Sequence, residues 1–244
     1  MMKPFLILQL RPEDETSDGE FEAILKYGGL ALEEVERIRI EVAGIPALNL
    51  DDYSAVIVGG SPFDISTPAK EKTAIQNTIE ADFNRLFDEI IPRDFPFLGA
   101  CSGNGLLGSY LGSCISRRYP EPVGSAVVSL TEAGRDDPLL RGFPQQISVL
   151  LGHKEACDST PEGATLLIRG EACPVQMFRL GQNVYATQFH PEGDAEGFIV
   201  RIHAYKHHGY FAPAQAQSLI DAVSRSDTPY AQEILRRFVE RYRG

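Results

Sequence analysis

A single cysteine between small residues constrains the fold of this chain more than any other feature. Residues 96–108 read PFLGACSGNGLLG, an apolar run that ends around Cys101 and leads into a helical pattern. Small residues on both sides let the chain turn sharply from strand to helix and lift the cysteine side chain into the open. Because open α/β sheets place their chemistry where strands end, the pattern predicts a reactive thiol at the carboxyl end of a buried strand.

A second strand-like segment stops at a histidine. Residues 187–192 read TQFHPE, so Glu192 follows His190 by two positions. A thiol needs a base to become a nucleophile, and the base needs a third group to orient it. We therefore expect Cys101 to be the nucleophile, His190 the general base and acid, and Glu192 the group that selects the imidazole tautomer. The helix N-terminus and a protonated histidine are both expected to lower the pKa of Cys101.

Backbone N–H groups near these motifs are candidates for an oxyanion hole. The N–H of Ser102 directly follows the nucleophile, and Gly60 lies in a glycine pair after the apolar run 55–58. Glycine there lets the backbone approach a substrate closely. Each motif alone also has a structural explanation: a packed turn, a loop tripeptide or a tight glycine turn. Their occurrence together at successive strand ends favours catalysis.

The order of apolar patterns predicts the fold class. Strand and helix patterns alternate early and strands dominate the middle, which indicates a mainly parallel sheet with an antiparallel extension. The acidic stretch 11–20 is expected to be a loop. Strands are predicted at 5–10, 35–41, 55–58, 96–100, 123–130, 146–151, 164–168, 174–180 and 183–189, and helices at 21–31, 70–91, 102–111, 194–207, 213–224 and 228–242.

Composition excludes several classes of protein. The 244 residues suffice for one domain, and a net charge of −11 without a basic run argues against binding to nucleic acid or acidic membranes. The chain has no long apolar stretch or leader-like segment, so we expect a soluble cytoplasmic protein without a membrane span. The four cysteines form no C-x-x-C pair, so we expect no metal and no cofactor, and we expect the three cysteines other than Cys101 to be small buried residues.

Taken together, the motifs resemble those of the class I (triad) glutamine amidotransferases, especially stand-alone members similar to the amidotransferase domain of GMP synthase. The elbow of that family reads Gly-x-Cys-x-Gly-x-Gln, and its closing strand ends in His-Pro-Glu. The corresponding segments here are 99–105 and 188–192, with 56–62 resembling the oxyanion strand and 152–155 a substrate-holding loop. The resemblance spans roughly residues 5–200.

The resemblance implies a flavodoxin-like α/β domain with helices on both faces of the sheet. We expect one domain over residues 1–244, with a core at about 5–202 and a helical C-terminal tail at about 203–244. The implied activity releases ammonia from the side-chain amide of glutamine through a γ-glutamyl thioester on Cys101. The ammonia would pass to a separate synthase or acceptor subunit, since no acceptor domain is present in the sequence. The implied substrate-binding residues are Ser61, Gly105, Gly152, His153 and Lys154.

One departure from the family pattern bears on the substrate. The glutamine that follows the elbow in the family, a substrate contact, is Gly105 here. The vacated space would admit water, a neighbouring side chain such as Asn104, or a larger leaving amine. A hydrolase of γ-glutamyl peptides or conjugates with the same triad is therefore an alternative. A non-catalytic regulatory subunit is another alternative. A DJ-1/PfpI-like protein is a further alternative, but the closing His-Pro-Glu argues against this last one.

Overall fold

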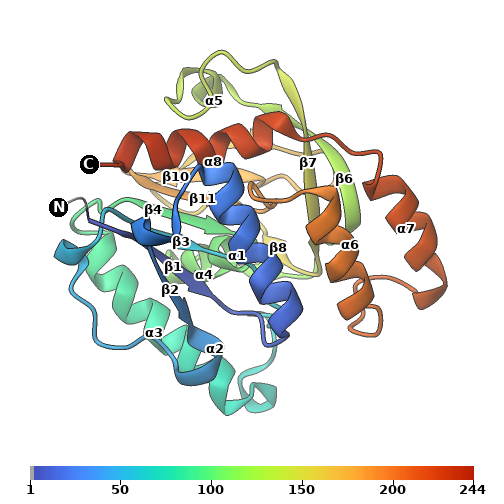
Figure 1. Ribbon diagram of the computed structural model, residues 1–244, viewed down its shortest axis with the longest axis horizontal. Coiled ribbons are helices and arrows are strands. Elements are labelled where there is room, and N and C mark those ends of the chain that lie inside the picture. Colours follow the sequence, from blue (N-terminus) through green and yellow to red (C-terminus); the bar gives the residue numbers. More distant parts are fainter. Residues whose placement is uncertain (1–2) are drawn as a thin grey trace.

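A nine-stranded mixed sheet organises the molecule. The computed structural model describes residues 3–244. The strand order is β2-β1-β3-β4-β11-β10-β9-β6-β7, with parallel pairing from β2 to β11 and antiparallel pairing from β11 to β7. Figure 1 shows the sheet with helices in front of it and behind it. The predicted mainly parallel sheet with an antiparallel extension is thus confirmed.

The elements follow the alternation of the sequence. The strands of the large sheet are β1 (Phe5–Gln9), β2 (Val35–Arg39), β3 (Ala55–Val58), β4 (Phe97–Ala100), β6 (Glu121–Leu130), β7 (Gln146–His153), β9 (Thr165–Arg169), β10 (Met177–Leu180) and β11 (Val184–Thr187), while β5 (Ile115–Ser116) pairs with β8 (Ala156–Cys157). The α-helices are α1 (Asp14–Gly28), α2 (Ile40–Ala43), α3 (Ala74–Ile90), α4 (Ser102–Tyr110), α5 (Glu132–Asp136), α6 (Ala195–Ala204), α7 (Ala216–Val223) and α8 (Pro229–Tyr242).

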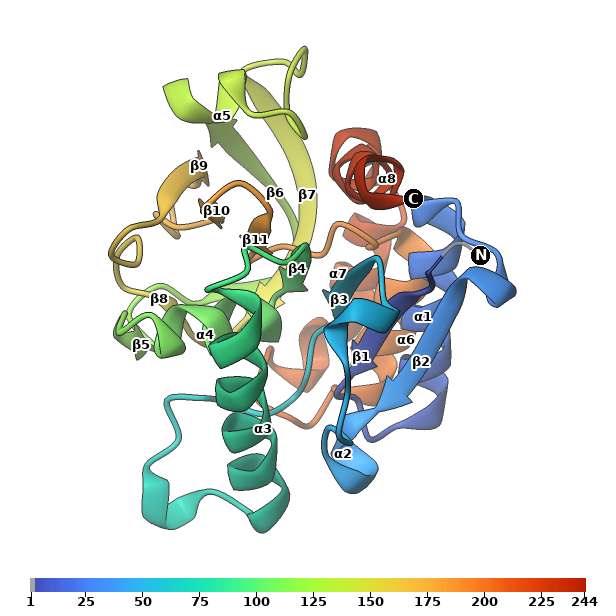
Figure 2. The same ribbon diagram turned by 90° about the vertical axis from the view of Figure 1, so that its left-hand side faces the viewer.

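Two apolar layers cover the two faces of the parallel strands. Successive residues of a strand point to opposite faces, and β1 divides in this way: Phe5 and Ile7 pack in one cluster, and Leu6 and Leu8 in the other. The first cluster includes side chains of α1 and α8, and the second includes side chains of α3 and α4. Figure 2 shows α3 and α4 on one side of the strands and α1, α6 and α8 on the other. Burial on both faces explains why these strands read as unbroken apolar runs.

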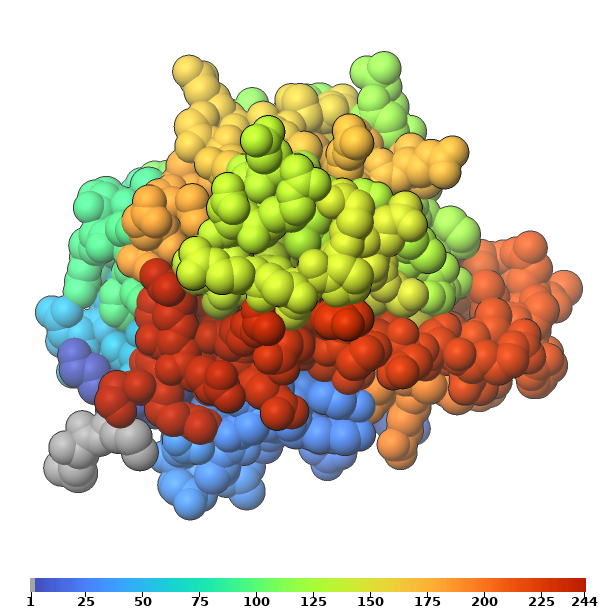
Figure 3. Space-filling view, turned by 90° about the horizontal axis from the view of Figure 1, so that it is seen from above, coloured from blue at the N-terminus to red at the C-terminus, as the bar shows by residue number. Residues whose placement is uncertain are grey.

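The C-terminal segment is built into the fold. Five side chains of α8 are buried in the same cluster as α1 and β7, namely Ala231, Ile234, Leu235, Phe238 and Val239. In the view from above, α8 lies between the surface of the N-terminal segment and that of the β6–β7 region (Figure 3). The predicted helical tail is therefore present, and it contributes to the main core.

Two expectations about local structure were wrong. The acidic stretch 11–20 is not a loop, because α1 begins at Asp14, and acidic residues in the first turn of a helix favour its N-terminal dipole. Cys114 is exposed and not buried, whereas Cys157 and Cys173 are buried as expected. Among the described residues, no helix combines the length and apolar character that crossing a membrane requires.

Candidate active site

Cys101 occupies a strained turn between β4 and α4. Its backbone has φ 51° and ψ −94°, a conformation that costs a residue with a side chain on the order of 1–3 kcal/mol. The Cys101 N–H donates to the carbonyl of Thr187 at the end of β11, 2.8 Å away. A Cβ on Gly99 would lie 2.8 Å from the carbonyl carbon of Gly103, so the close packing of strand on helix requires glycine there. The small residues around the cysteine therefore form the predicted elbow.

His190 and Glu192 follow β11, the strand that pairs with β4. The Nδ1 of His190 lies 2.6 Å from Oε1 of Glu192, and both side chains are almost fully buried. The imidazole edge also packs against Phe198 of α6. Cys101 and His190 line one cavity, which brings the three predicted catalytic residues to one edge of the sheet. A Cβ on Gly60 would lie 2.7 Å from Cε1 of His190, so the glycine permits this close approach.

A chain of buried charges continues from this pair. Arg201 of α6 donates to Glu192 at 2.9 Å, and its Nη2 lies 3.5 Å from Glu20 of α1. Glu20 accepts a hydrogen bond from Nε of Arg11 at 2.6 Å. Each of these four side chains is at most 8% exposed. Positive and negative side chains alternate in this series of ion pairs. Each carboxylate therefore has the cationic partner that a buried carboxylate requires.

Sequence reasoning did not identify Arg11, Glu20 or Arg201. A signal existed for Arg201, because it lies between Phe198 and Ile202 on the buried face of α6. A charged residue within an apolar helical stripe is unusual unless it has a buried partner. Glu20 lies on the buried face of α1 in the same way, but the expectation of a loop over 11–20 hid that periodicity.

Burial overrides the expected activation of the thiol. It raises the pKa of Cys101 to about 12, and the nearby guanidinium groups of Arg11 and Arg201 offset only part of this effect. The expectation of a lowered pKa was therefore wrong for the resting state. Burial also lowers the pKa of His190, against the opposing effect of Glu192. At neutral pH the site thus contains a neutral thiol and a neutral imidazole, the reactant pair for general-base catalysis.

Glu192 is the ionised member of the group. Burial alone would raise its pKa, but the proximity of His190 and Arg201 outweighs burial and lowers the pKa far below its ordinary value. An ionised carboxylate beside Nδ1 requires that nitrogen to carry the proton, which leaves Nε2 free to accept one. The structure thereby positions Glu192 to orient the imidazole.

The two predicted oxyanion donors differ in their surroundings. The N–H of Ser102 lies at the N-terminus of α4, beside the thiol. The N–H of Gly60 donates to Oε2 of Glu20 at 3.2 Å, so in this structure it already has an acceptor. The N–H of Ser61, one residue further on, has no hydrogen-bond acceptor among the described residues. Ser61 also lines both cavities next to Cys101.

All five predicted substrate-binding residues lie together. Ser61, Gly105, Gly152, His153 and Lys154 line one cavity beside Cys101. This cavity and its neighbour have volumes of only ≈ 20 and ≈ 30 Å³, each room for about one water molecule. Tyr210, in the C-terminal segment, lines both, and its hydroxyl donates to the carbonyl of Ser61 at 3.4 Å.

The space expected beside Gly105 is filled by an isoleucine. A Cβ on Gly105 would lie 2.7 Å from Cδ1 of Ile65. The loop that carries Ile65 is held by Glu155, whose carboxylate accepts the N–H groups of Ile65 and Ser66 at 2.6 and 2.8 Å. Asn104, the neighbour that we considered for this space, instead accepts a hydrogen bond from the Cys157 thiol at 3.3 Å.

The chain matches a family of known proteins over most of its length. The family model "Glutamine amidotransferase class-I" matches residues 21–198. The chain is 28% identical to the glutamine amidotransferase-like protein YfeJ of Salmonella typhimurium over 148 residues, which covers 61% of this chain and 60% of YfeJ. It is also 28% identical over 148 residues to a subunit of the glutamine-hydrolyzing GMP synthase from Sulfurisphaera tokodaii, covering 60% of this chain and 71% of that protein.

A plant relative and a solved structure extend the comparison. Gamma-glutamyl peptidase 3 of Arabidopsis thaliana is 26% identical over 189 residues, which covers 75% of this chain and 72% of the peptidase. The crystal structure of a glutamine amidotransferase from Thermotoga maritima superimposes with a TM-score of 0.77 at 23% identity and covers 98% of this chain and 97% of its own. The shared architecture is the flavodoxin-like α/β fold.

Proposed function

Because the chain belongs to the class-I glutamine amidotransferase family, we propose that it hydrolyses the side-chain amide of glutamine through a thioester on Cys101. The observation that carries the proposal is the strained Cys101 elbow in one cavity with His190, whose other nitrogen is held by Glu192. A non-catalytic subunit would have no need for the backbone strain at Cys101 or for the buried charges around His190.

The first half of the reaction forms the thioester. The thiol sulfur attacks the γ-carbonyl carbon while Nε2 of His190 takes the thiol proton. His190 then gives that proton to the leaving nitrogen, and ammonia departs as the carbonyl re-forms. Because the pKa of Cys101 is raised by burial, proton transfer accompanies attack and does not precede substrate binding. Glu192 stabilises the imidazolium that forms between the two transfers.

The second half releases glutamate. A water molecule gives its proton to His190 and attacks the thioester carbonyl, and the thiolate leaves and recovers the proton from His190. In both halves the negative oxygen needs preorganised donors. We propose the N–H groups of Ser102 and Ser61, since the N–H of Gly60 is held by Glu20. Gly60 can serve in that role only if its hydrogen bond to Glu20 breaks.

Hydrolysis of γ-glutamyl peptides or conjugates is a second candidate. Gly105 offers no side-chain contact to the amide of glutamine, but Ile65 fills the space that was expected to admit a larger leaving amine. The observation that favours this candidate is the 26% identity to a gamma-glutamyl peptidase over 75% of the chain. The chemistry is unchanged, because only the group on the leaving nitrogen differs. The similarity to the GMP synthase relative instead favours transfer of ammonia to a separate synthase subunit.

One experiment separates these functions. Ammonia and glutamate release is measured with glutamine and with several γ-glutamyl dipeptides, using the wild type and Cys101→Ala in parallel. Release from glutamine that Cys101→Ala abolishes supports the amidotransferase, and preference for the dipeptides supports the second candidate. An unchanged rate in Cys101→Ala, or no turnover of any γ-glutamyl compound together with no reaction of Cys101 with a glutamine-like chloroketone, would contradict both.

A further inference from the structure

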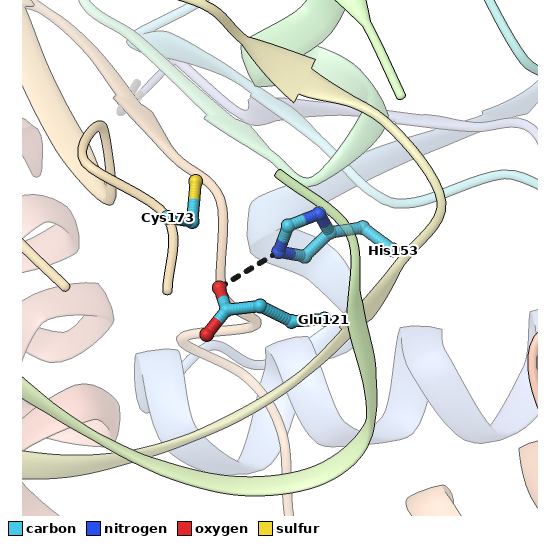
Figure 4. A group of neighbouring side chains, drawn as sticks. All are labelled: Glu121, His153 and Cys173. Atoms are coloured by element: carbon cyan, nitrogen blue, oxygen red, sulfur yellow. Dashed lines mark hydrogen bonds and ion pairs between the residues drawn. The ribbon is translucent and has the colours of Figure 1, made fainter. Parts of the chain in front are cut away.

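Three buried side chains from separate segments converge next to the active-site cavity. Glu121 begins β6, His153 ends β7 and Cys173 lies in the loop between β9 and β10. A carboxylate oxygen, an imidazole nitrogen and the sulfur all lie within 4.8 Å of one another. Figure 4 shows Glu121 and His153 facing each other with Cys173 beside them. Only His153 of the three also lines the cavity beside Cys101.

The hydrogen bonds of His153 leave this cluster short of one positive charge. Its Nδ1 lies 3.0 Å from the carbonyl oxygen of Glu155, which can only accept, so Nδ1 carries a proton. Its Nε2 lies 3.0 Å from Oε2 of Glu121, which is also an acceptor when ionised. A lone pair on nitrogen would therefore face a carboxylate oxygen at hydrogen-bond distance. The contact becomes attractive only if a proton or a metal ion lies between the two groups.

Within the described part of the chain, no lysine or arginine forms an ion pair with Glu121, and its one ion-pair partner there is His153 itself. Among the described residues, the hydrogen-bond partners of the Glu121 carboxylate are His153 and Gln176. The other buried cluster of this kind, Glu20 with His190 and Glu192, differs in that Arg11 and Arg201 neutralise it. A buried carboxylate is costly without a cationic partner, so the charge balance at Glu121 accommodates a cation.

We propose that Glu121, His153 and Cys173 bind one divalent ion of the zinc class. Oxygen, nitrogen and sulfur donors in one site match the ligands of zinc, whereas magnesium and calcium take oxygen ligands. Binding replaces the Cys173 thiol proton with a metal–sulfur bond, and the proton passes to the solvent. The ion would join the loop of Cys173 to β6 and β7, and would fix His153 in the wall of the cavity.

The surroundings of the cluster provide the supporting contacts that such a site needs. A metal-bound histidine usually donates its second N–H to a carbonyl or carboxylate, as Nδ1 of His153 does to Glu155. Gln176 donates from Nε2 to Glu121 at 2.5 Å and so orients the carboxylate. Oε1 of Gln176 is buried and has no hydrogen-bond partner among the described residues.

The test measures metal binding itself and does not depend on activity. Metal-free protein is titrated with zinc chloride and with cobalt(II) in a Cys101→Ser background, so that the elbow thiol cannot contribute. We expect about one equivalent per chain, and with cobalt a thiolate charge-transfer band in the near ultraviolet. Cys173→Ser should remove the band, whereas Cys114→Ser, at an exposed cysteine, should retain it. Gln176→Ala should weaken binding roughly 10–100-fold, as for other outer-shell contacts.

Two outcomes would overturn the proposal. Failure of the Cys101→Ser protein to bind either ion would mean that a proton supplies the missing charge. Stoichiometric binding that persists in both Cys173→Ser and His153→Gln would place the ion elsewhere. Circular dichroism of each variant checks that it is folded, and the Cys101→Ser protein provides a result that does not depend on the folding of the ligand variants.

Discussion

Replacing Arg201 tests whether the buried charge chain sets the proton affinity of the catalytic base. Arg201→Met removes the guanidinium that donates to Glu192 at 2.9 Å and lies 3.5 Å from Glu20. Both carboxylates are at most 2% exposed, so each loses a partner that water cannot replace. Removing one partner of a buried ion pair typically costs about 3–5 kcal/mol. For a chain of this size, that loss corresponds to a decrease in Tm of about 6–20 °C.

The same substitution should change the pH profile in a defined direction. The charge of Arg201 lowers the pKa of His190, so its removal should raise that pKa. Activity requires neutral His190, and the acid limb of kcat/KM should therefore move to higher pH. Arg201→Lys, which retains the charge, should leave the limb closer to the wild-type position.

The assay is the rate of glutamate release from the preferred γ-glutamyl substrate as a function of pH, with Tm measured on the same samples. Arg225→Met, at an exposed arginine, is the matched control for the change in net charge and should alter neither quantity appreciably. An acid limb of Arg201→Met that stays in place or moves to lower pH would refute the conclusion that the charge of Arg201 lowers the pKa of His190.

Three further predictions concern the residues at the cavity. A glutamine-like chloroketone should label Cys101 in preference to the other three cysteines, and mass spectrometry of the labelled peptides would reveal any other target. His190→Ala should lower the rate roughly 10²–10⁴-fold. Glu192→Gln should cost less and move the acid limb to lower pH, because the carboxylate raises the pKa of His190; a greater loss in Glu192→Gln would reverse these roles. In Gly105→Gln alone, the new side chain should clash with Ile65. In the Ile65→Ala background, Gly105→Gln should lower KM for glutamine relative to Ile65→Ala alone. An unchanged KM would argue against this position as a substrate contact.

Local sequence patterns identified the strands and the turn that carry the candidate catalytic residues. Strand positions follow from apolar runs, and the elbow follows from small residues around Cys101, because a turn between neighbouring elements depends on the residues within it. His190 and Glu192 could be found for the same reason, since they are two residues apart at the end of one strand. The parallel order of the early strands follows from their alternation with helices.

Contacts between distant segments decided the rest. Arg11, Glu20 and Arg201 meet only because β1, α1 and α6 pack together, and their spacing in the sequence carries no record of that contact. The side chain that lies next to Gly105 is Ile65, forty positions earlier in the sequence. Glu155 holds the loop that carries Ile65 in this place.

The sequence by itself thus determined which residues stand at the strand ends, and the tertiary structure decided their chemical state. The pKa of Cys101 is raised because desolvation depends on all the atoms that surround the thiol, whereas the helix N-terminus that would lower it is a local feature. The N–H of Gly60 donates to Glu20 for the same reason, since its acceptor comes from another element. Burial and pairing depend on contacts across the whole fold, and only folding brings those contacts together.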